Sequence, residues 1–133
     1  MMAQRPGTFL RYGALLLAIG LAAPLAAQEG EIPEALHGLW AAGPEHCTDP
    51  ASDGRVEVTA RAVSFYAAYF TVRSVRRDGL YWIAEADVNE EDEEDARPGR
   101  LTMRLAAPDR LDIAIDNDAS QQLVRCAEGP LQR

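Results

Sequence analysis

Apolar and polar residues alternate with a period of two in several segments of the chain after residue 55. The segments 56–61, 101–105 and 111–115 show this pattern most clearly. Such alternation is typical of strands with one buried and one exposed face. Together with segments rich in aromatic and β-branched residues, it predicts seven strands, at 56–61, 63–66, 68–75, 80–86, 101–105, 111–115 and 122–126.

Turn signals separate several of these segments. Asp78-Gly79 tolerates the positive φ angles of a tight hairpin turn. Pro98-Gly99 and Pro108-Asp109 predict two further turns. With short connections and no long amphipathic helix, the chain is predicted to be all-β, an antiparallel meander of about seven strands. Such a meander hides its edges by closing as a small barrel or by folding as a sandwich.

The segment before the first strand is predicted to be different. Residues 32–39 predict a short N-terminal helical segment, in which Pro33 suits the first helical position and Glu34 is favourable beside the helix N-terminus. Residues 43–54 are rich in Gly, Pro, Asp and Ser and predict a loop, which carries Cys47.

The first 27 residues have the pattern of a cleaved export signal. Two arginines precede an apolar run over residues 13–23, and small residues follow up to Ala27. An uncleaved membrane anchor is the alternative, but the run is shorter than the roughly 20 apolar residues of a spanning helix, and Pro24 interrupts it. We expect cleavage after Ala27, a single domain over residues 28–133 without a membrane span, and a periplasmic or extracellular location.

The predicted mature domain is strongly acidic. Residues 28–133 hold all 21 acidic residues and all but two of the 13 basic ones, a formal net charge of about −10. Nucleic acids are bound by clustered basic residues, so this composition argues against a nucleic-acid partner. An extended anionic membrane surface is disfavoured for the same electrostatic reason. Basic proteins and peptides are compatible partners.

The chain has two cysteines, Cys47 and Cys126. An even number of cysteines in an exported protein predicts a disulfide, which would join the loop before the first predicted strand to the end of the last one. Two free or intermolecular thiols are one alternative. A zinc site that includes His37 and His46 is another, although these four residues lack the short paired spacing of zinc ligands.

Residues near both ends of the domain carry a resemblance to a known family. Gly38-Leu39-Trp40 has the Gly-x-Trp form found where the barrel begins in lipocalins and other calycins, and Arg125 lies on the last predicted strand, where those proteins commonly place an arginine over that tryptophan. The chain therefore resembles a small secreted bacterial calycin, a lipocalin-like β-barrel domain. The resemblance implies that Trp40 and Arg125 form an end-closure pair, with the guanidinium on the indole face. By themselves, these residues also fit a core tryptophan and a surface arginine.

The most conspicuous polar feature is a run of six consecutive acidic residues, namely Glu90, Glu91, Asp92, Glu93, Glu94 and Asp95. Calcium binding is one interpretation, because hard cations take several carboxylate oxygens. An EF-hand register that begins at Asp87 fails, since it places an aspartate where glycine is needed and Pro98 where the bidentate glutamate belongs. A solvated loop and a contact with a basic partner are the other interpretations.

Aromatic residues concentrate at 65–70 and 81–82. Alternation turns neighbouring rings to opposite faces of a sheet, so that most are expected in the core while some remain exposed. We consider four of them a candidate surface for a ligand or partner: Tyr66, Tyr69, Tyr81 and Trp82.

The sequence lacks a pattern typical of catalysis. Both histidines precede the predicted sheet, no serine lies in a recognised nucleophile turn, and phosphate-binding glycine loops are absent. We expect no catalytic residue, metal site or cofactor. The sequence favours a noncatalytic secreted or periplasmic binding domain that engages a small apolar ligand or an envelope component. The alternative is an inhibitor or protein-interaction module whose acidic loop binds a basic partner.

Overall fold

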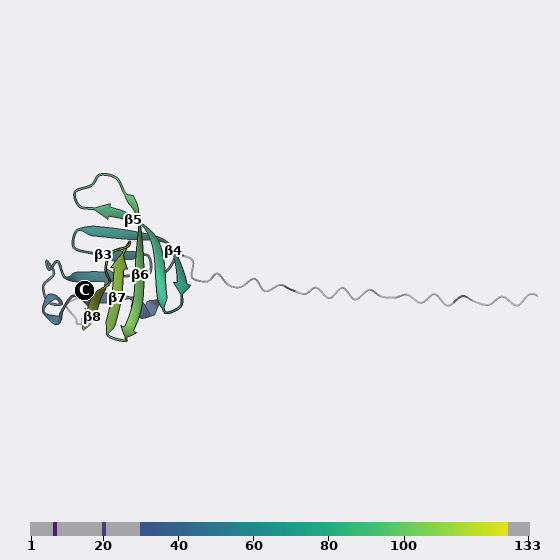
Figure 1. Cartoon of the computed structure of the whole chain (residues 1–133), viewed down its shortest axis with the longest axis horizontal. Coiled ribbons are helices and arrows are strands. Elements are labelled where there is room, and N and C mark those ends of the chain that lie inside the picture. Colours follow the sequence, from purple (N-terminus) through teal and green to yellow (C-terminus); the bar gives the residue numbers. More distant parts are fainter. Residues whose placement is uncertain (1–6, 8–19, 21–29, 128–133) are drawn as a thin grey trace, which may run out of the picture.

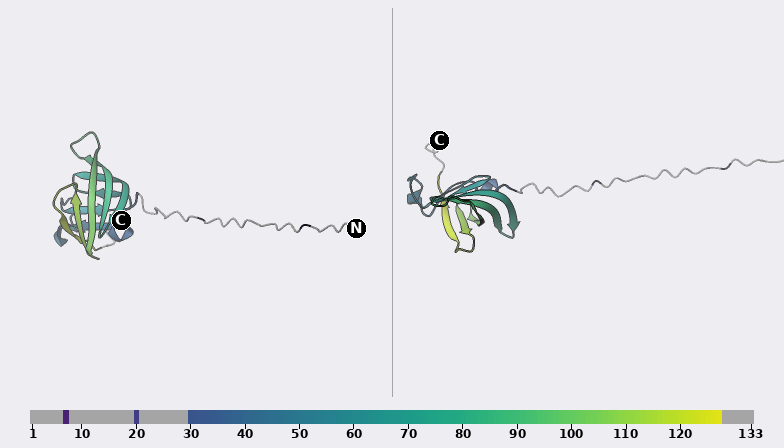
Figure 2. Two further views of the ribbon diagram at one scale, coloured as in Figure 1. Left: turned by 45° about the vertical axis from the view of Figure 1, so that its right-hand side comes forward. Right: turned by 90° about the horizontal axis from the view of Figure 1, so that it is seen from above.

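A computed structural model describes Gly7, Gly20 and residues 30–127, so the predicted export signal, apart from these two glycines, and its cleavage site lie outside the described residues. The described chain forms a closed antiparallel barrel of eight strands (Figure 1). The strands are β1 (Gly38–Ala41), β2 (Arg55–Val58), β3 (Ala62–Ser64), β4 (Ala68–Asp78), β5 (Tyr81–Glu90), β6 (Arg97–Ala107), β7 (Arg110–Ile115) and β8 (Gln121–Arg125). Figure 2 shows the long strands β4, β5 and β6 curving around the barrel.

The predicted all-β meander is confirmed. Each strand pairs with its neighbour in sequence, and β1 pairs with β8, so the sheet closes as a barrel and not as a sandwich. The predicted hairpin at Asp78-Gly79 joins β4 to β5, and Gly79 has a φ of +61°. The predicted turn at Pro108-Asp109 joins β6 to β7.

The strand that the sequence analysis did not predict is β1. It lies partly where the sequence predicts a helical segment. Only a single 3₁₀ turn, η1 (Glu34–Leu36), forms, and the chain is a strand from Gly38 onward. Gly38 has a φ of +130°, a conformation that favours glycine. A Cβ at this position would also lie 3.0 Å from Nη1 of Arg125. Trp40 and Ala41 of this strand are both buried. A strand of four residues is too short for its apolar and polar pattern to indicate this burial.

The predicted turn at Pro98-Gly99 is wrong, because both residues lie within β6. Here β6 extends beyond its pairing with β7, which begins at Leu101, so the missing N–H of Pro98 removes no ladder hydrogen bond toward β7. Gly99 is buried, and a Cβ there would overlap the side chain of Val88. The glycine therefore serves close packing of two strands and not a turn.

Apolar side chains from all eight strands and η1 fill the interior. In the described part of the chain no polar or charged side chain is buried. On β2, Val56 and Val58 are buried and Glu57 is exposed, so the alternation in sequence is the alternation of burial. The largest fully buried side chains include Trp40, Phe70, Ile32, Leu36, Leu101, Met103, Leu111, Ile113 and Leu123.

The barrel closes through a short contact between its first and last strands. Two residue pairs connect β1 to β8, Trp40 with Arg125 and Ala41 with Val124. The fully buried indole of Trp40 donates a hydrogen bond of 3.0 Å to the carbonyl oxygen of Leu36, which holds η1 against the barrel.

Arg125 supports this contact with its whole side chain. Its guanidinium carbon lies 4.1 Å from the ring centroid of Trp40. The guanidinium donates hydrogen bonds to the carbonyl oxygens of Ala35 at 2.9 Å, His37 at 2.7 Å and Pro108 at 3.0 Å. One side chain therefore links β8 to the segment before β1 and to the β6–β7 turn.

The predicted disulfide between Cys47 and Cys126 is confirmed, with Cα atoms 5.5 Å apart. It joins the β1–β2 loop to the residue after β8, where the N–H of Cys126 also donates to the carbonyl oxygen of Leu39 at 2.8 Å. A disulfide fits a protein outside the cytoplasm, where thiols are not kept reduced. Among the described residues, no helix has the length and apolar character needed to cross a membrane.

Removing the disulfide should destabilise the barrel strongly. The two cysteines are 79 positions apart, and closing a loop of that length is worth about 4 to 5 kcal/mol in the chain-entropy model. We expect the double variant Cys47→Ser/Cys126→Ser to unfold at a much lower temperature than the oxidised protein, as measured by circular dichroism. A reductant should lower the midpoint of the wild type toward that of the variant and leave the variant unchanged. Equal midpoints for all samples would contradict the structural role of the disulfide.

Replacing Arg125 by lysine should also weaken closure, because an ammonium cannot donate to three carbonyls in one plane and stack on the indole. We expect Arg125→Lys to lower the free energy of unfolding by about 1 to 3 kcal/mol in urea denaturation. Arg110→Lys, at an exposed position on β7, is the matched control and should change it by less than about 0.5 kcal/mol. Similar losses in both variants would show that the contacts of Arg125 are not specific.

Candidate functional site

Four loops gather at one end of the barrel, because consecutive antiparallel strands alternate in direction. These are the β1–β2 loop (residues 42–54), the β3–β4 loop (65–67), the β5–β6 loop (91–96) and the β7–β8 loop (116–120). We call this end the open end. The opposite end, which carries η1 and the guanidinium of Arg125, is the closed end.

An open pocket of about 710 Å³ lies among these loops. Its apolar lining comes from Val56, Phe65, Ala68 and Ile115, which all belong to or pack against the hydrophobic core. Phe65 meets the buried Phe70 edge to face, with ring centroids 5.3 Å apart. We call this cavity the open-end pocket. It begins where the buried core ends, at the open end of the barrel.

Carboxylates dominate the polar lining of the open-end pocket. Asp53 comes from the β1–β2 loop, and the β5 end and β5–β6 loop contribute Glu90, Glu91, Asp92 and Glu93. The four loops of the open end together hold ten acidic residues and no arginine. Two acidic segments far apart in the sequence are therefore brought to one cavity.

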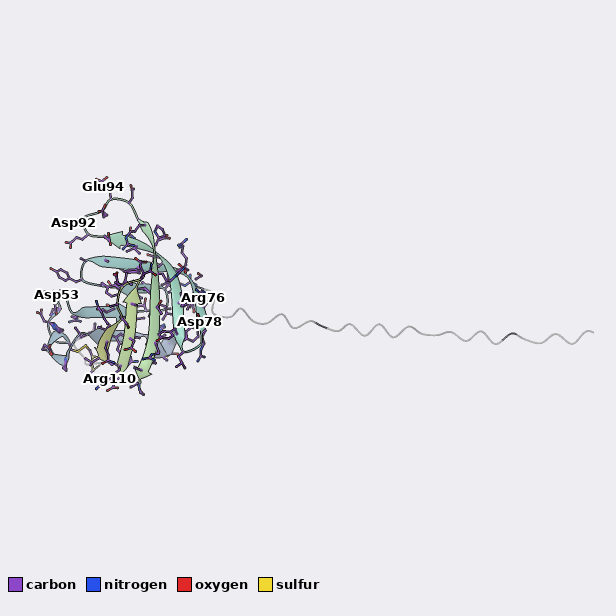
Figure 3. All side chains as sticks on the ribbon, viewed as in Figure 1. Asp53, Arg76, Asp78, Asp92, Glu94 and Arg110 are labelled. Carbon is purple, nitrogen blue, oxygen red and sulfur yellow. A yellow bond between two sulfur atoms is a disulfide. The ribbon has the colours of Figure 1, made fainter. Side chains whose placement is uncertain are left out.

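Backbone hydrogen bonds position the β5–β6 loop. The N–H of Glu91 donates to the carbonyl oxygen of Ala67 at 3.0 Å, and the N–H of Glu93 donates to that of Glu90 at 3.1 Å. Figure 1 shows this loop projecting beyond the strands. In Figure 3, Asp92 and Glu94 lie on this projection, whereas Arg110 lies at the opposite end of the barrel.

Arg97 compensates two carboxylates, Glu90 in the pocket lining and Asp116 in the β7–β8 loop. Its guanidinium contacts Glu90 at 2.8 Å and Asp116 at 3.3 Å, which ties the start of β6 to the end of β5 and to the β7–β8 loop. The hydrogen bond with Glu90 raises the pKa of Arg97 above its ordinary value, so the arginine stays charged. Within the described part of the chain, none of residues 91–95 forms an ion pair.

The four aromatic residues of the candidate surface lie at two different ends of the barrel. Tyr66 lines the open-end pocket and is 64% exposed. Tyr69 is exposed near the start of β4, next to its buried neighbour Phe70. Tyr81 and Trp82 begin β5, at the closed end. Only Tyr66 of the four therefore contributes to the open-end pocket.

A second, smaller pocket of about 400 Å³ at the closed end contains Trp82 and the exposed Leu80. The guanidinium carbon of Arg77 lies 5.3 Å from the ring centroid of Trp82. Arg104 also lines this pocket, and its hydrogen bond with Asp112 raises the pKa of Arg104. The two pockets thus differ in charge, because arginines line this one.

Neither metal interpretation of the sequence is supported by the arrangement of side chains. Among the described residues, no group of three or more His, Cys, Asp or Glu side chains is arranged so that it could hold a metal ion. Both cysteines are bonded to each other, which removes them from the alternative zinc site.

One polar contact at the open end was not anticipated from the sequence. Nδ1 of His46 lies 2.5 Å from Oγ of Ser52, and Nε2 of His46 lies 3.5 Å from the exposed Glu45. These are the residue types of a nucleophile and its base. However, Oγ of Ser52 also accepts the N–H of Gly54 at 3.1 Å, the pattern of a local turn. We interpret the contact as support for the β1–β2 loop.

The apolar lining of the pocket was also missed. Alternation along the strands places Val56 and Ile115 on the interior face, but it gives no sign that Ile115 remains half-buried at an open end. The candidate site is therefore defined by tertiary geometry, as an open apolar pocket under a rim of carboxylates. Comparison with protein-family models, curated proteins and solved structures found no match for this chain.

Proposed function

We propose that the protein is a noncatalytic binding domain that takes a small ligand with an apolar body into the open-end pocket. The observation that carries the proposal is the pocket itself, whose volume of about 710 Å³ falls in the range of small-molecule sites. Its lining by Phe65, Ala68 and Ile115, which are only partly buried, offers apolar surface that the core leaves uncovered. A periplasmic or extracellular location is supported by the disulfide and by the export-signal pattern.

A lipocalin-like relationship is part of this proposal. It is supported by Gly38-Leu39-Trp40 at the start of β1, by Arg125 over the Trp40 ring and by the closed meander of eight strands. Eight-stranded barrels are either filled by their own side chains or hold one small ligand. Side chains such as Phe70 and Leu101 fill the interior here, which supports a ligand site at the open end.

A neutral apolar fluorophore should report binding in this pocket. We expect N-phenyl-1-naphthylamine to bind the wild type saturably, with increased emission as it leaves water. Ala42→Phe should weaken this binding by about tenfold or more, because Ala42 lines the pocket and a larger side chain would occupy it. Fluorescence titration measures both affinities.

Ala51→Phe is the matched control, at an exposed position of the same loop that is not part of the pocket lining. It should leave the affinity unchanged. Failure of the wild type to bind the fluorophore saturably would contradict the proposed function. Equal affinities of the wild type and Ala42→Phe would place the binding elsewhere.

The projecting β5–β6 loop favours a second candidate function, the binding of a basic protein. Residues 91–95 are all acidic, lie beyond the strands and form no ion pair within the described chain (Figure 3). Exposed charges of one sign steer and orient a partner of opposite charge. If the protein has this second function, it is an inhibitor or a protein-interaction module.

This second candidate predicts salt-dependent binding to a basic protein such as lysozyme. Replacing all five acidic residues at 91–95 by their amides should abolish the binding in surface plasmon resonance, because the charges that attract the partner are removed. Retention of the affinity by this variant, or an affinity that salt does not change, would exclude the acidic loop as the contact.

A further inference from the structure

We infer that the open-end pocket selects ligands that carry a positive charge next to their apolar body, as amphipathic amines do. The inference rests on the proposed function, since it names the ligand class of the same pocket. It draws on three features of that pocket, namely its negative charge, the lack of ion pairs at the carboxylates of the β5–β6 loop, and an exposed aromatic ring beside the apolar lining.

The first feature is the negative electrostatic field of the carboxylates at the pocket. Asp53 of the β1–β2 loop and Glu91, Asp92 and Glu93 of the β5–β6 loop come from separate segments, and the barrel fold brings them to one cavity. Asp53 and Asp92, almost forty positions apart in sequence, both line it. A cavity with low-dielectric walls and charges of one sign concentrates counter-ions and raises their rate of association. A ligand that carries its own cation is favoured in such a field.

The second feature is that, among the described residues, the carboxylates at 91–95 form no ion pair. Arg97 forms ion pairs with Glu90 and Asp116 and does not line the pocket. His46 is the basic side chain in the lining, and it already lies beside Glu45. The carboxylates on the β5–β6 loop therefore keep their charge available for a ligand.

The third feature is an exposed aromatic ring at the same cavity. Tyr66 lines the pocket directly after Phe65 and is 64% exposed. Its ring is therefore accessible to a ligand in the pocket. The face of an aromatic ring attracts an ammonium group, most strongly when the group is partly desolvated. The apolar body of the same ligand would cover Phe65 and Ile115, which lie in the same lining and are partly buried.

The chemistry of the lining also disfavours the opposite charge. A carboxylate-headed ligand would place its charge among Asp53, Glu91 and Asp92, where repulsion opposes the gain from burying its chain. Arginines line the closed-end pocket, which therefore lacks this preference for cations. The open-end pocket is thus expected to rank ligands of equal apolar area as cation, then neutral, then anion.

Three probes with the same alkyl chain test this order: octyltrimethylammonium, octanol and octanoate. Isothermal titration calorimetry on the intact oxidised protein, below micelle-forming concentrations, should give about tenfold tighter binding for the cation than for the alcohol at low salt. Octanoate should bind most weakly. The advantage of the cation should shrink as salt is raised, because the Debye length falls.

Neutralising part of the rim should remove the preference and keep the pocket. The triple variant Glu91→Gln/Asp92→Asn/Glu93→Gln should bind the cation about tenfold more weakly and octanol unchanged. Its matched control is Glu34→Gln/Asp78→Asn/Asp109→Asn, which makes the same change in net charge at exposed positions of the closed end. This control should keep the affinity of the wild type for the cation.

The outcomes separate the inference from the proposed function. Equal affinities for the cation and the alcohol, or tighter binding of octanoate, would overturn the inference and leave the proposed function in place. Failure of all three probes to bind would overturn the proposed function itself. An equal loss in the rim variant and its control would show that net charge, and not the rim, attracts the cation, and would also overturn the inference.

Discussion

The structure depends on the contact that closes the barrel. Among the described residues, β1 and β8 pair at two positions, so backbone pairing at this point is short. Arg125 reinforces it by stacking on Trp40 and by donating to three carbonyl oxygens, and the disulfide fastens the adjoining loop to the residue after β8. Without this closure the sheet would keep two exposed edges, and its loops would not face one another around a cavity.

Closure also gives the barrel two ends that differ in their interactions. Carbonyl oxygens near η1 and the β6–β7 turn are held by Arg125, so the closed end is fixed by interactions within the chain. At the open end, apolar side chains continuous with the core stay accessible, and carboxylates surround them. The proposed ligand site is at the open end, where apolar side chains are accessible and the carboxylates of the β5–β6 loop have no ion pair among the described residues.

A concentration of like charge at one end opposes folding, and two features reduce its effect. The acidic residues of the β5–β6 loop are exposed, so water screens their repulsion. Arg97 compensates Glu90, the last residue of β5, and Asp116, which follows β7. The remaining field points into solvent, where a charged ligand or a basic protein would meet it.

The sequence by itself determined the strands that have strong local signals, because side-chain alternation and turn chemistry act between near neighbours. It indicated β2, β7 and the Asp78-Gly79 hairpin, the disulfide and the residues of the closing pair. It placed a turn at Pro98-Gly99, where close packing on Val88 requires glycine within a strand. Only the tertiary structure decided that β1 begins at Gly38 and that two acidic segments share one pocket with Phe65 and Ile115. Both facts depend on contacts between residues distant in the chain, which local patterns do not encode.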